Sequence, residues 1–232
     1  MVHTTEVQVP TSGGAMPATV LSPGAEPAAG IVVCQEIFGV TGYIRRWAQR
    51  LAEAGYAVLT PEFYWRLPQP GPVEGAGALE QGVELMQQFD WELGVADGAA
   101  AVRWLRAELG TGGRVGLVGF CFGGGLAFNI AALEPVQTLV SFYGSALPGL
   151  VALAPRVRCA QQHHWGLADA YVDADTVARI ERAVAGPDTE FWTYPGADHA
   201  FDNEDFVNAD PGASALARER TGTFLARTLP AT

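Results

Sequence analysis

The stretch that decides the fold is Gly119-Phe120-Cys121-Phe122-Gly123, which stands between an apolar run and a helical pattern. The preceding run, Arg114–Gly119, has the continuous apolar character of a strand buried on both faces. The following segment, Phe122–Leu133, has a helical pattern and ends before Pro135. A chain that turns sharply from strand to helix strains the residue at the turn, and small neighbours avoid clashes there. The spacing therefore predicts a strand, a tight turn that raises Cys121 above a sheet, and a helix.

Cys121 has the sequence position of a nucleophile in the pattern Gly-x-nucleophile-x-Gly. At a helix N-terminus the dipole favours thiolate over thiol, and the N–H of Phe122 can point at a developing oxyanion. The alternative interpretation is a tight turn that holds a small buried cysteine. Cys34 and Cys159 lie at the ends of other predicted strands, and we expect both to be packing residues.

Strand and helix patterns alternate outward from this turn. The expected strands are Thr5–Val9, Ala18–Leu21, Gly30–Cys34, Tyr56–Thr60, Arg114–Gly119, Thr138–Tyr143, Ala160–Gly166 and Glu190–Tyr194. The expected helices are Tyr43–Ala54, Trp91–Leu109, Phe122–Leu133, Asp175–Ala185 and Ala213–Thr228. This order predicts an α/β fold with a mostly parallel central sheet of about eight strands and helices on both faces. We expect one domain over residues 1–232, with the first two strands antiparallel and Pro61–Gly77 as a loop over the carboxyl edge of the sheet, where such folds bind ligands.

Composition narrows the class of protein. The chain has 232 residues, of which 49% are hydrophobic and 17% charged, so it is not a disordered chain. Its formal charge of −11 disfavours nucleic acid and anionic membranes as partners. The sequence has no apolar run long enough for a membrane span and no secretory signal. Three cysteines without a CxxC pair predict neither a disulfide framework nor structural zinc, so we expect a cytoplasmic protein with free thiols, no metal and no cofactor.

An acid and a histidine follow Cys121 in the order that a hydrolytic triad on this kind of sheet requires. Asp169 stands in the turn after the strand Ala160–Gly166, with Asp173 and Asp175 as less well placed competitors. His199 lies in the loop after the last strand, where it can exchange a proton with the sulfur while Asp169 fixes its tautomer.

The remaining interpretations of these two residues are structural. Asp169 could be a turn or N-cap aspartate, and His199 could be a loop histidine that caps a turn. His163 and His164 lie within a predicted strand on opposite faces, which favours hydrogen-bonded core groups over metal ligands.

The loop after the strand Gly30–Cys34 supplies two further candidates. In α/β hydrolases this loop gives the second oxyanion N–H, and here that residue is Ile37. Glu36 would project near Cys121, where its charge opposes thiolate formation. It could act as an alternative proton acceptor or as a gate that keeps the thiol neutral, or it could simply bond loop backbone.

Three segments together resemble the dienelactone hydrolase family: Gln35–Val40, Phe89–Asp97 and Val115–Gly124. The resemblance, with the contexts of Asp169 and His199, spans nearly the whole chain. It implies an α/β-hydrolase fold without a large lid, a Cys-His-Asp triad, and hydrolysis of an activated cyclic enol ester through an acyl-cysteine. It also implies that Glu36 holds the thiol at rest and accepts its proton when substrate binds.

The sequence departs from the family at two substrate-binding positions. Members that cleave dienelactone hold the substrate carboxylate with two arginines, and the corresponding positions here are Leu79 and Asn203. Arg66 is nearby but displaced in sequence. Losing two charge-assisted contacts of roughly 1.5–3 kcal/mol each weakens binding of an anionic substrate.

The pocket walls are expected to include Phe38, Trp65, Tyr143 and Phe201, each of which could equally be core, with Arg66 and Asn203 as further substrate-binding candidates. We therefore expect a cysteine-dependent hydrolase of a small lactone or activated ester, of the carboxymethylenebutenolidase type, present as a monomer or weak homodimer. The alternatives are a carboxylesterase for neutral esters and a non-catalytic binding protein with the same fold.

Overall fold

A single eight-stranded sheet runs through the protein in the order β1-β2-β4-β3-β5-β6-β7-β8. The computed structural model describes residues 1–24, 27–108 and 113–231. The strands are β1 His3–Thr11, β2 Gly14–Ser22, β3 Gly30–Cys34, β4 Ala57–Pro61, β5 Val115–Phe120, β6 Thr138–Phe142, β7 Ala160–Gly166 and β8 Thr189–Tyr194. Strands β3 to β8 pair in parallel, and β1 and β2 join as an antiparallel extension beside β4. The predicted α/β fold with a mostly parallel sheet is confirmed.

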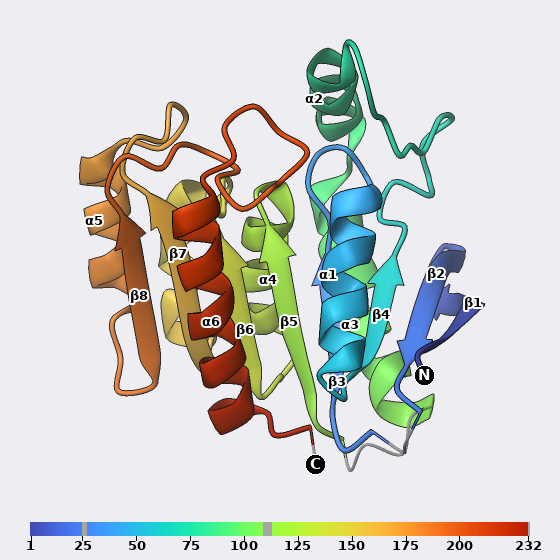
Figure 1. Cartoon of the computed structure of the whole chain (residues 1–232). Coiled ribbons are helices and arrows are strands. Elements are labelled where there is room, and N and C mark those ends of the chain that lie inside the picture. Colours follow the sequence, from blue (N-terminus) through green and yellow to red (C-terminus); the bar gives the residue numbers. More distant parts are fainter. Residues whose placement is uncertain (25–26, 109–112, 232) are drawn as a thin grey trace.

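Helices cover both faces of this sheet (Figure 1). The helices are α1 Gly42–Glu53, α2 Ala78–Gln88, α3 Trp91–Glu108, α4 Phe122–Leu133, α5 Ala174–Val184 and α6 Pro211–Thr228, with short 3₁₀ turns η1 Leu147–Gly149 and η2 Val151–Arg156. Helices α1 and α6 lie on one face, and α3, α4 and α5 lie on the other. The predicted end of the third helix at Leu109 lies outside the described residues.

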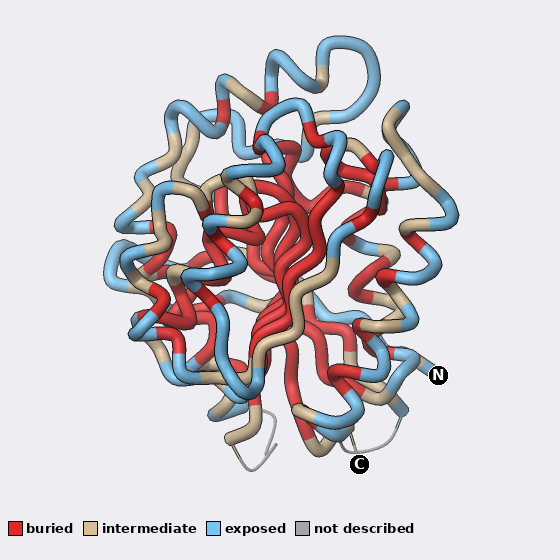
Figure 2. Tube along the Cα trace, turned by 90° about the vertical axis from the view of Figure 1, so that its left-hand side faces the viewer, coloured by how far each residue is buried: buried red, intermediate tan, exposed pale blue. Residues whose placement is uncertain are grey.

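The core follows from the parallel arrangement. Strands β3, β4, β5 and β6 are buried at every position, because helices shield both of their faces from water. Figure 2 shows this buried sheet as a continuous band through the middle of the molecule, with the exposed residues on the surrounding helices and loops. Each carboxyl end of a parallel strand therefore leaves a rigid core at the same edge, and that edge can position side chains from distant parts of the chain.

Helix α2 is the main element that the sequence pattern did not predict. It follows the irregular segment 62–77, and Gly82 and Leu85 are the only buried residues of this helix. The helix stands above the carboxyl edge of the sheet (Figure 1). Because it packs on loops and not on the sheet, several of its apolar side chains stay partly exposed, among them Leu79 and Met86. None of the described helices has the length and apolar character that crossing a bilayer requires.

Candidate active site

Cys121 occupies a strained turn between β5 and α4, as the sequence predicts. Its backbone has φ 53° and ψ −119°, a conformation that costs about 1–3 kcal/mol in a residue other than glycine. The surrounding backbone fixes it: the Cys121 N–H donates to the Phe142 carbonyl at 3.0 Å. The Cys121 carbonyl accepts from the N–H groups of Gly124 at 3.0 Å and Ser145 at 3.1 Å. The fold thus holds the sulfur outward at the end of the strand.

The flanking glycines are required by close backbone contacts. A Cβ on Gly119 would lie 2.1 Å from the Gly123 carbonyl oxygen. A Cβ on Gly123 would lie 2.3 Å from the carbonyl oxygens of both Cys34 and Gln35. Helix α4 can therefore begin directly against the end of β3 only with glycine at these positions. This contact brings the loop after β3 next to Cys121.

The structure brings Cys121, His199 and Asp169 together. His199 Nε2 lies 3.1 Å from Cys121 Sγ, and His199 Nδ1 lies 2.8 Å from Asp169 Oδ2. All three residues are buried, with exposed fractions of 7% to 9%. Burial alone disfavours the imidazolium, but the charges and hydrogen bonds of Cys121 and Asp169 outweigh it and raise the pKa of His199 to about 11. The arrangement therefore favours a proton on the imidazole next to the sulfur.

Asp169 is oriented by the backbone that follows it. Its Oδ1 accepts hydrogen bonds from the N–H groups of Tyr171 at 2.8 Å and Val172 at 3.1 Å. These bonds leave Oδ2 for the imidazole of His199. The carboxylate is thus fixed by a turn of its own loop, so it can hold the histidine in one orientation.

The competing acids and histidines have structural roles. Asp173 caps α5, because its side chain accepts from the N–H of Thr176 at 2.7 Å, and Asp175 lies in the first turn of that helix. His163 and His164 are fully buried in β7, where burial lowers the pKa of both imidazoles. Of the acids and histidines considered as candidates, Asp169 and His199 are the two that form the chain of contacts to Cys121 Sγ.

Glu36 lines the same pocket as Cys121 and is buried, with 1% of its surface exposed. Its Oε2 accepts from Asn203 Nδ2 at 2.7 Å, whereas Oε1 has no partner among the described residues. Burial raises the pKa of Glu36 to about 7, although the positive charge of His199 and the Asn203 bond oppose this shift. The carboxyl group can therefore gain or lose a proton near neutral pH. The sulfur of Cys121 contacts His199 Nε2 and, at 3.7 Å, Ser145 Oγ, so its hydrogen-bond partners in this structure do not include Glu36.

The two predicted oxyanion donors lie next to Cys121 in sequence or line the same pocket. Phe122 is the first residue of α4, and Ile37 follows Glu36 in the loop after β3. Within the described parts of the chain, neither backbone N–H donates to an acceptor of the protein. Both amides are therefore free to donate to a substrate oxygen.

A pocket of about 180 Å³ opens above Cys121. It is enclosed by loops from the carboxyl edge of the sheet and by α2. The lining residues are Glu36, Ile37, Phe38, Leu79, Val83, Met86, Cys121, Ser145, Tyr171, His199, Ala200 and Phe206. Of the predicted wall residues, Phe38 lies in this lining.

Three other predicted substrate-binding residues lie behind the pocket and not in its wall. Tyr143 is fully buried and packs edge-on against the His199 ring, with ring centroids 5.2 Å apart. Phe201 is also fully buried and packs against Tyr143 at 5.4 Å. Asn203 reaches Glu36 and not the pocket. These residues support the reacting groups from the protein side.

Trp65 and Arg66 are not brought to the pocket, contrary to the sequence prediction. Both side chains bind the buried carboxylate of Asp97 on α3: Trp65 Nε1 donates at 2.9 Å and Arg66 Nη2 at 2.8 Å. The guanidinium also lies over the Trp65 ring, 4.2 Å from its centroid. The physical reason is that a carboxylate with only 2% of its side chain exposed needs a cation, and Arg66 supplies it.

Several lining residues were missed by sequence reasoning. Ser145 follows strand β6 and Tyr171 follows Asp169, so their positions after parallel strands were an available signal. Ala200 and Phe206 lie in the loop that carries His199. Ala200 has φ 58° and Tyr143 has φ 37°. With Cys121 they are the non-glycine residues of positive φ in the described ranges, and all three lie at this site. Such clustering of backbone strain is typical of functional sites.

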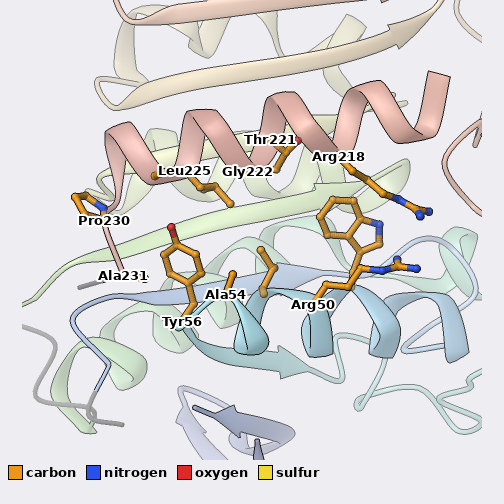
Figure 3. A pocket seen from close by; sticks show the side chains of 12 residues that line it. Arg50, Ala54, Tyr56, Arg218, Thr221, Gly222, Leu225, Pro230 and Ala231 are labelled. Atoms are coloured by element: carbon orange, nitrogen blue, oxygen red, sulfur yellow. The ribbon is translucent and has the colours of Figure 1, made fainter. Parts of the chain in front are cut away.

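A larger hollow of about 410 Å³ lies elsewhere, between α1 and α6 (Figure 3). Figure 3 shows Arg50 and Arg218 near one end of it and Tyr56 and Pro230 near the other. It contains none of the predicted catalytic residues. The smaller pocket is the one that holds the reactive groups.

Comparison with known proteins gives consistent matches. A model described as the dienelactone hydrolase family matches residues 16–229. A carboxymethylenebutenolidase of Pseudomonas putida is 38% identical over 213 residues, covering 90% of each chain. Carboxymethylenebutenolidase 1 of Cupriavidus pinatubonensis is 33% identical, covering 93% of each chain. Among solved structures, a putative dienelactone hydrolase from Klebsiella pneumoniae superposes with a TM-score of 0.87 at 28% identity, covering 98% of this chain and 99% of that one.

Proposed function

This chain belongs to the dienelactone hydrolase family and is a hydrolase of ester or lactone bonds, and we propose that it works through an acyl intermediate on Cys121. The observation that carries the proposal is the line of contacts from Cys121 Sγ through His199 to Asp169, at 3.1 and 2.8 Å. A small lactone or activated ester is the proposed substrate, and the relatives named carboxymethylenebutenolidases support a lactone ester bond as the bond that is cleaved.

Acylation begins with attack of the Cys121 sulfur on the ester carbonyl carbon. A carbon–sulfur bond forms, and the carbonyl oxygen takes up negative charge that the N–H groups of Phe122 and Ile37 stabilise. The intermediate collapses by breaking the bond to the leaving oxygen, which receives a proton from His199. In a lactone the leaving oxygen stays attached to the acyl group, so the ring opens without release of a fragment.

Deacylation restores the enzyme. His199 Nε2 accepts a proton from water, and the resulting hydroxide attacks the thioester carbon. The carbon–sulfur bond breaks, the product leaves as a carboxylic acid, and Cys121 returns to its starting state. Asp169 keeps the imidazole oriented and stabilises the imidazolium in both halves of the reaction.

Glu36 is proposed as a second acceptor for the thiol proton when substrate binds. Its place in the same pocket as Cys121, its Oε1 without a hydrogen-bond partner in the described parts of the chain and a pKa of about 7 support this role. An ionised Glu36 disfavours the thiolate before substrate binds, and a Glu36 that has accepted the thiol proton is neutral and no longer repels the thiolate.

The rival functions use the same fold. A carboxylesterase for neutral esters would use the same acyl chemistry, so the covalent mechanism does not depend on that choice. A non-catalytic binding protein would not need the oriented Asp169 carboxylate or two free oxyanion donors, and these features favour catalysis. We further propose that the enzyme acts in the cytoplasm as a monomer or weak homodimer. Its three cysteines are free thiols, which supports a reducing compartment.

The test compares two cysteine variants with p-nitrophenyl acetate as substrate. Cys121→Ala should lose turnover by about a thousand-fold or more while circular dichroism shows an intact fold. Cys159→Ala, at a partly buried cysteine outside the pocket, should retain turnover. Acid-quenched wild-type enzyme should carry one acetyl group, located on Cys121 by peptide mass spectrometry. Turnover by Cys121→Ala at the wild-type rate would refute the proposal, and stoichiometric acetylation without turnover would identify the binding protein instead.

A further inference from the structure

One face of α2 forms part of the wall of the pocket that contains Cys121. Leu79, Val83 and Met86 are spaced four and three residues apart, so they lie on one side of the helix, and all three line the pocket. Leu79 and Met86 keep 41% and 36% of their surfaces exposed, although both are large apolar residues. This helix contributes few residues to the core, so its apolar face is directed at whatever the pocket binds.

The rest of the pocket continues the same chemistry. Phe38 and Phe206 pack with ring centroids 5.5 Å apart, and both line the pocket with Ile37. Tyr171 stands at the mouth, 67% exposed, with its ring edge-on to His199 at 5.1 Å. Apart from the reacting groups and Ser145, the lining consists of apolar and aromatic side chains.

The lining contains no arginine, and its one basic side chain, His199, is already paired with Cys121 and Asp169. The chain has 14 basic residues, all of them arginines, and every one lies in the described ranges. None of them lines the pocket. Arg66 is bound to Asp97, and Arg46, on the helix after the Glu36 loop, is bound to Glu204 and Asp205. The lining also contains the carboxyl group of Glu36, which offers an anionic substrate no counter-charge and repels it when ionised.

From this lining we propose that the enzyme selects esters or lactones whose acyl or ring portion is neutral and apolar, and that the α2 face sets this preference. The inference rests on the proposed function and names its substrate class. A cavity of about 150 Å³ with apolar walls accommodates benzene, so the space of about 180 Å³ here fits a portion of similar size. A substrate carboxylate placed against the α2 face would lose its hydration without gaining an arginine as a partner, because His199 is already bound to Cys121 and Asp169.

The experiment uses two esters of matched length: p-nitrophenyl valerate and mono-p-nitrophenyl glutarate, which differ in a terminal methyl or carboxylate. The wild type should favour the neutral ester in kcat/KM by about 30-fold or more, because the anion is desolvated without a partner. Leu79→Arg should reduce that ratio at least about 5-fold by raising kcat/KM for the glutarate. Leu216→Arg makes the same change on α6 at a residue of equal exposure, 40%, outside the pocket, and should leave the ratio unchanged.

Two outcomes would overturn the inference. One is a wild type that hydrolyses the glutarate ester as fast as the valerate or faster. The other is an equal change of the ratio in both arginine variants, which would assign the effect to overall charge. The ester comparison and the cysteine test can fail independently. The ester comparison tests the substrate preference, whereas inactivity of Cys121→Ala toward both esters tests only the mechanism. Turnover by Cys121→Ala would instead refute the acyl-cysteine mechanism.

Discussion

Asn203 Nδ2 donates a hydrogen bond to Glu36 Oε2 at 2.7 Å, across 167 positions of the chain. The contact joins the loop after β8, which carries His199, to the loop after β3, which carries Ile37. This bond therefore connects the loop of the proposed proton acceptor with the loop of the proposed second oxyanion donor. Glu36 is thus part of the support of the site as well as a candidate for proton transfer.

Removing this bond should raise the pKa of Glu36. Burial already raises that pKa to about 7, and the Asn203 amide opposes the shift by stabilising the carboxylate. In Asn203→Ala the opposing bond is lost, so we expect the pKa to move above 7. Isotope-edited infrared titration of the carboxyl group measures it. Asn129→Ala, which removes an amide bonded to Trp91, is the control and should leave the Glu36 titration in place. A pKa at or below the wild-type value in Asn203→Ala would contradict the assignment.

The acid of the triad can be distinguished from its neighbour by a matched pair of substitutions. Asp169→Asn leaves the side-chain shape but removes the charge that holds His199 Nδ1, so kcat should fall by about 10³–10⁴. Asp173→Asn changes only the cap of α5, and kcat should stay near the wild-type value. Steady-state kinetics on an activated ester decide the matter. Equal losses in both variants would remove Asp169 from its proposed role.

The sequence predicted the parts of the site that depend on backbone geometry. The glycines around Cys121 leave few alternatives to a sharp turn, and the positions of Asp169 and His199 follow from parallel strands that all end at one edge. All eight strands were predicted, with bounds that differ by a few residues at some ends. For β3 and β5 the signal is a continuous apolar run, which reports burial on both faces.

The sequence did not predict features that depend on pairing between side chains. Arg66 was expected near substrate, but its partner Asp97 lies 31 positions away on α3, and nothing local identifies that contact. Helix α2 was missed because it packs on loops and keeps much of its apolar face exposed. The sequence alone did not distinguish the apolar residues of α2 that line the pocket from ordinary surface residues.

The His199 loop has a second anchor in Asp202, whose loss should weaken both stability and rate. Asp202 accepts hydrogen bonds from Tyr43 at 2.6 Å, Trp47 at 2.7 Å and Arg218 at 2.9 Å, and its side chain is fully buried. In Asp202→Asn one acceptor oxygen becomes an NH₂ group that faces donors, and Arg218 loses its counter-charge. We expect a loss of about 3 kcal/mol in the free energy of unfolding.

The same variant should show a lower kcat because the loop that places His199 is no longer fixed. Urea denaturation and ester kinetics measure the two effects. Asp188→Asn, on the loop before β8, is the control for a charge change away from this anchor. Wild-type stability and wild-type kcat in Asp202→Asn would show that the anchor does not position the histidine.

The raised pKa of Glu36 should make stability depend on pH in a defined window. The folded pKa is about 7 and the ordinary value is 4.5, so the folded state keeps the Glu36 proton over a range in which the unfolded chain has released it. The stabilisation is fully present below about pH 4.5 and is lost as the pH rises through about 7. At 1.36 kcal/mol per pKa unit it amounts to about 3 kcal/mol.

Glu36→Gln isolates this contribution, because glutamine keeps the size of the side chain but does not titrate. The free energy of unfolding of the wild type minus that of the variant should therefore fall by about 3 kcal/mol between about pH 4.5 and pH 8. Taking the difference cancels groups common to both proteins, including His199, whose raised pKa removes stability only as pH rises from about 6.5 through 11. Glu84→Gln, at an exposed glutamate of α2, gives the effect of the same substitution on the surface. A wild-type minus Glu36→Gln difference that stays constant over this range would show that Glu36 is not held as a buried neutral acid.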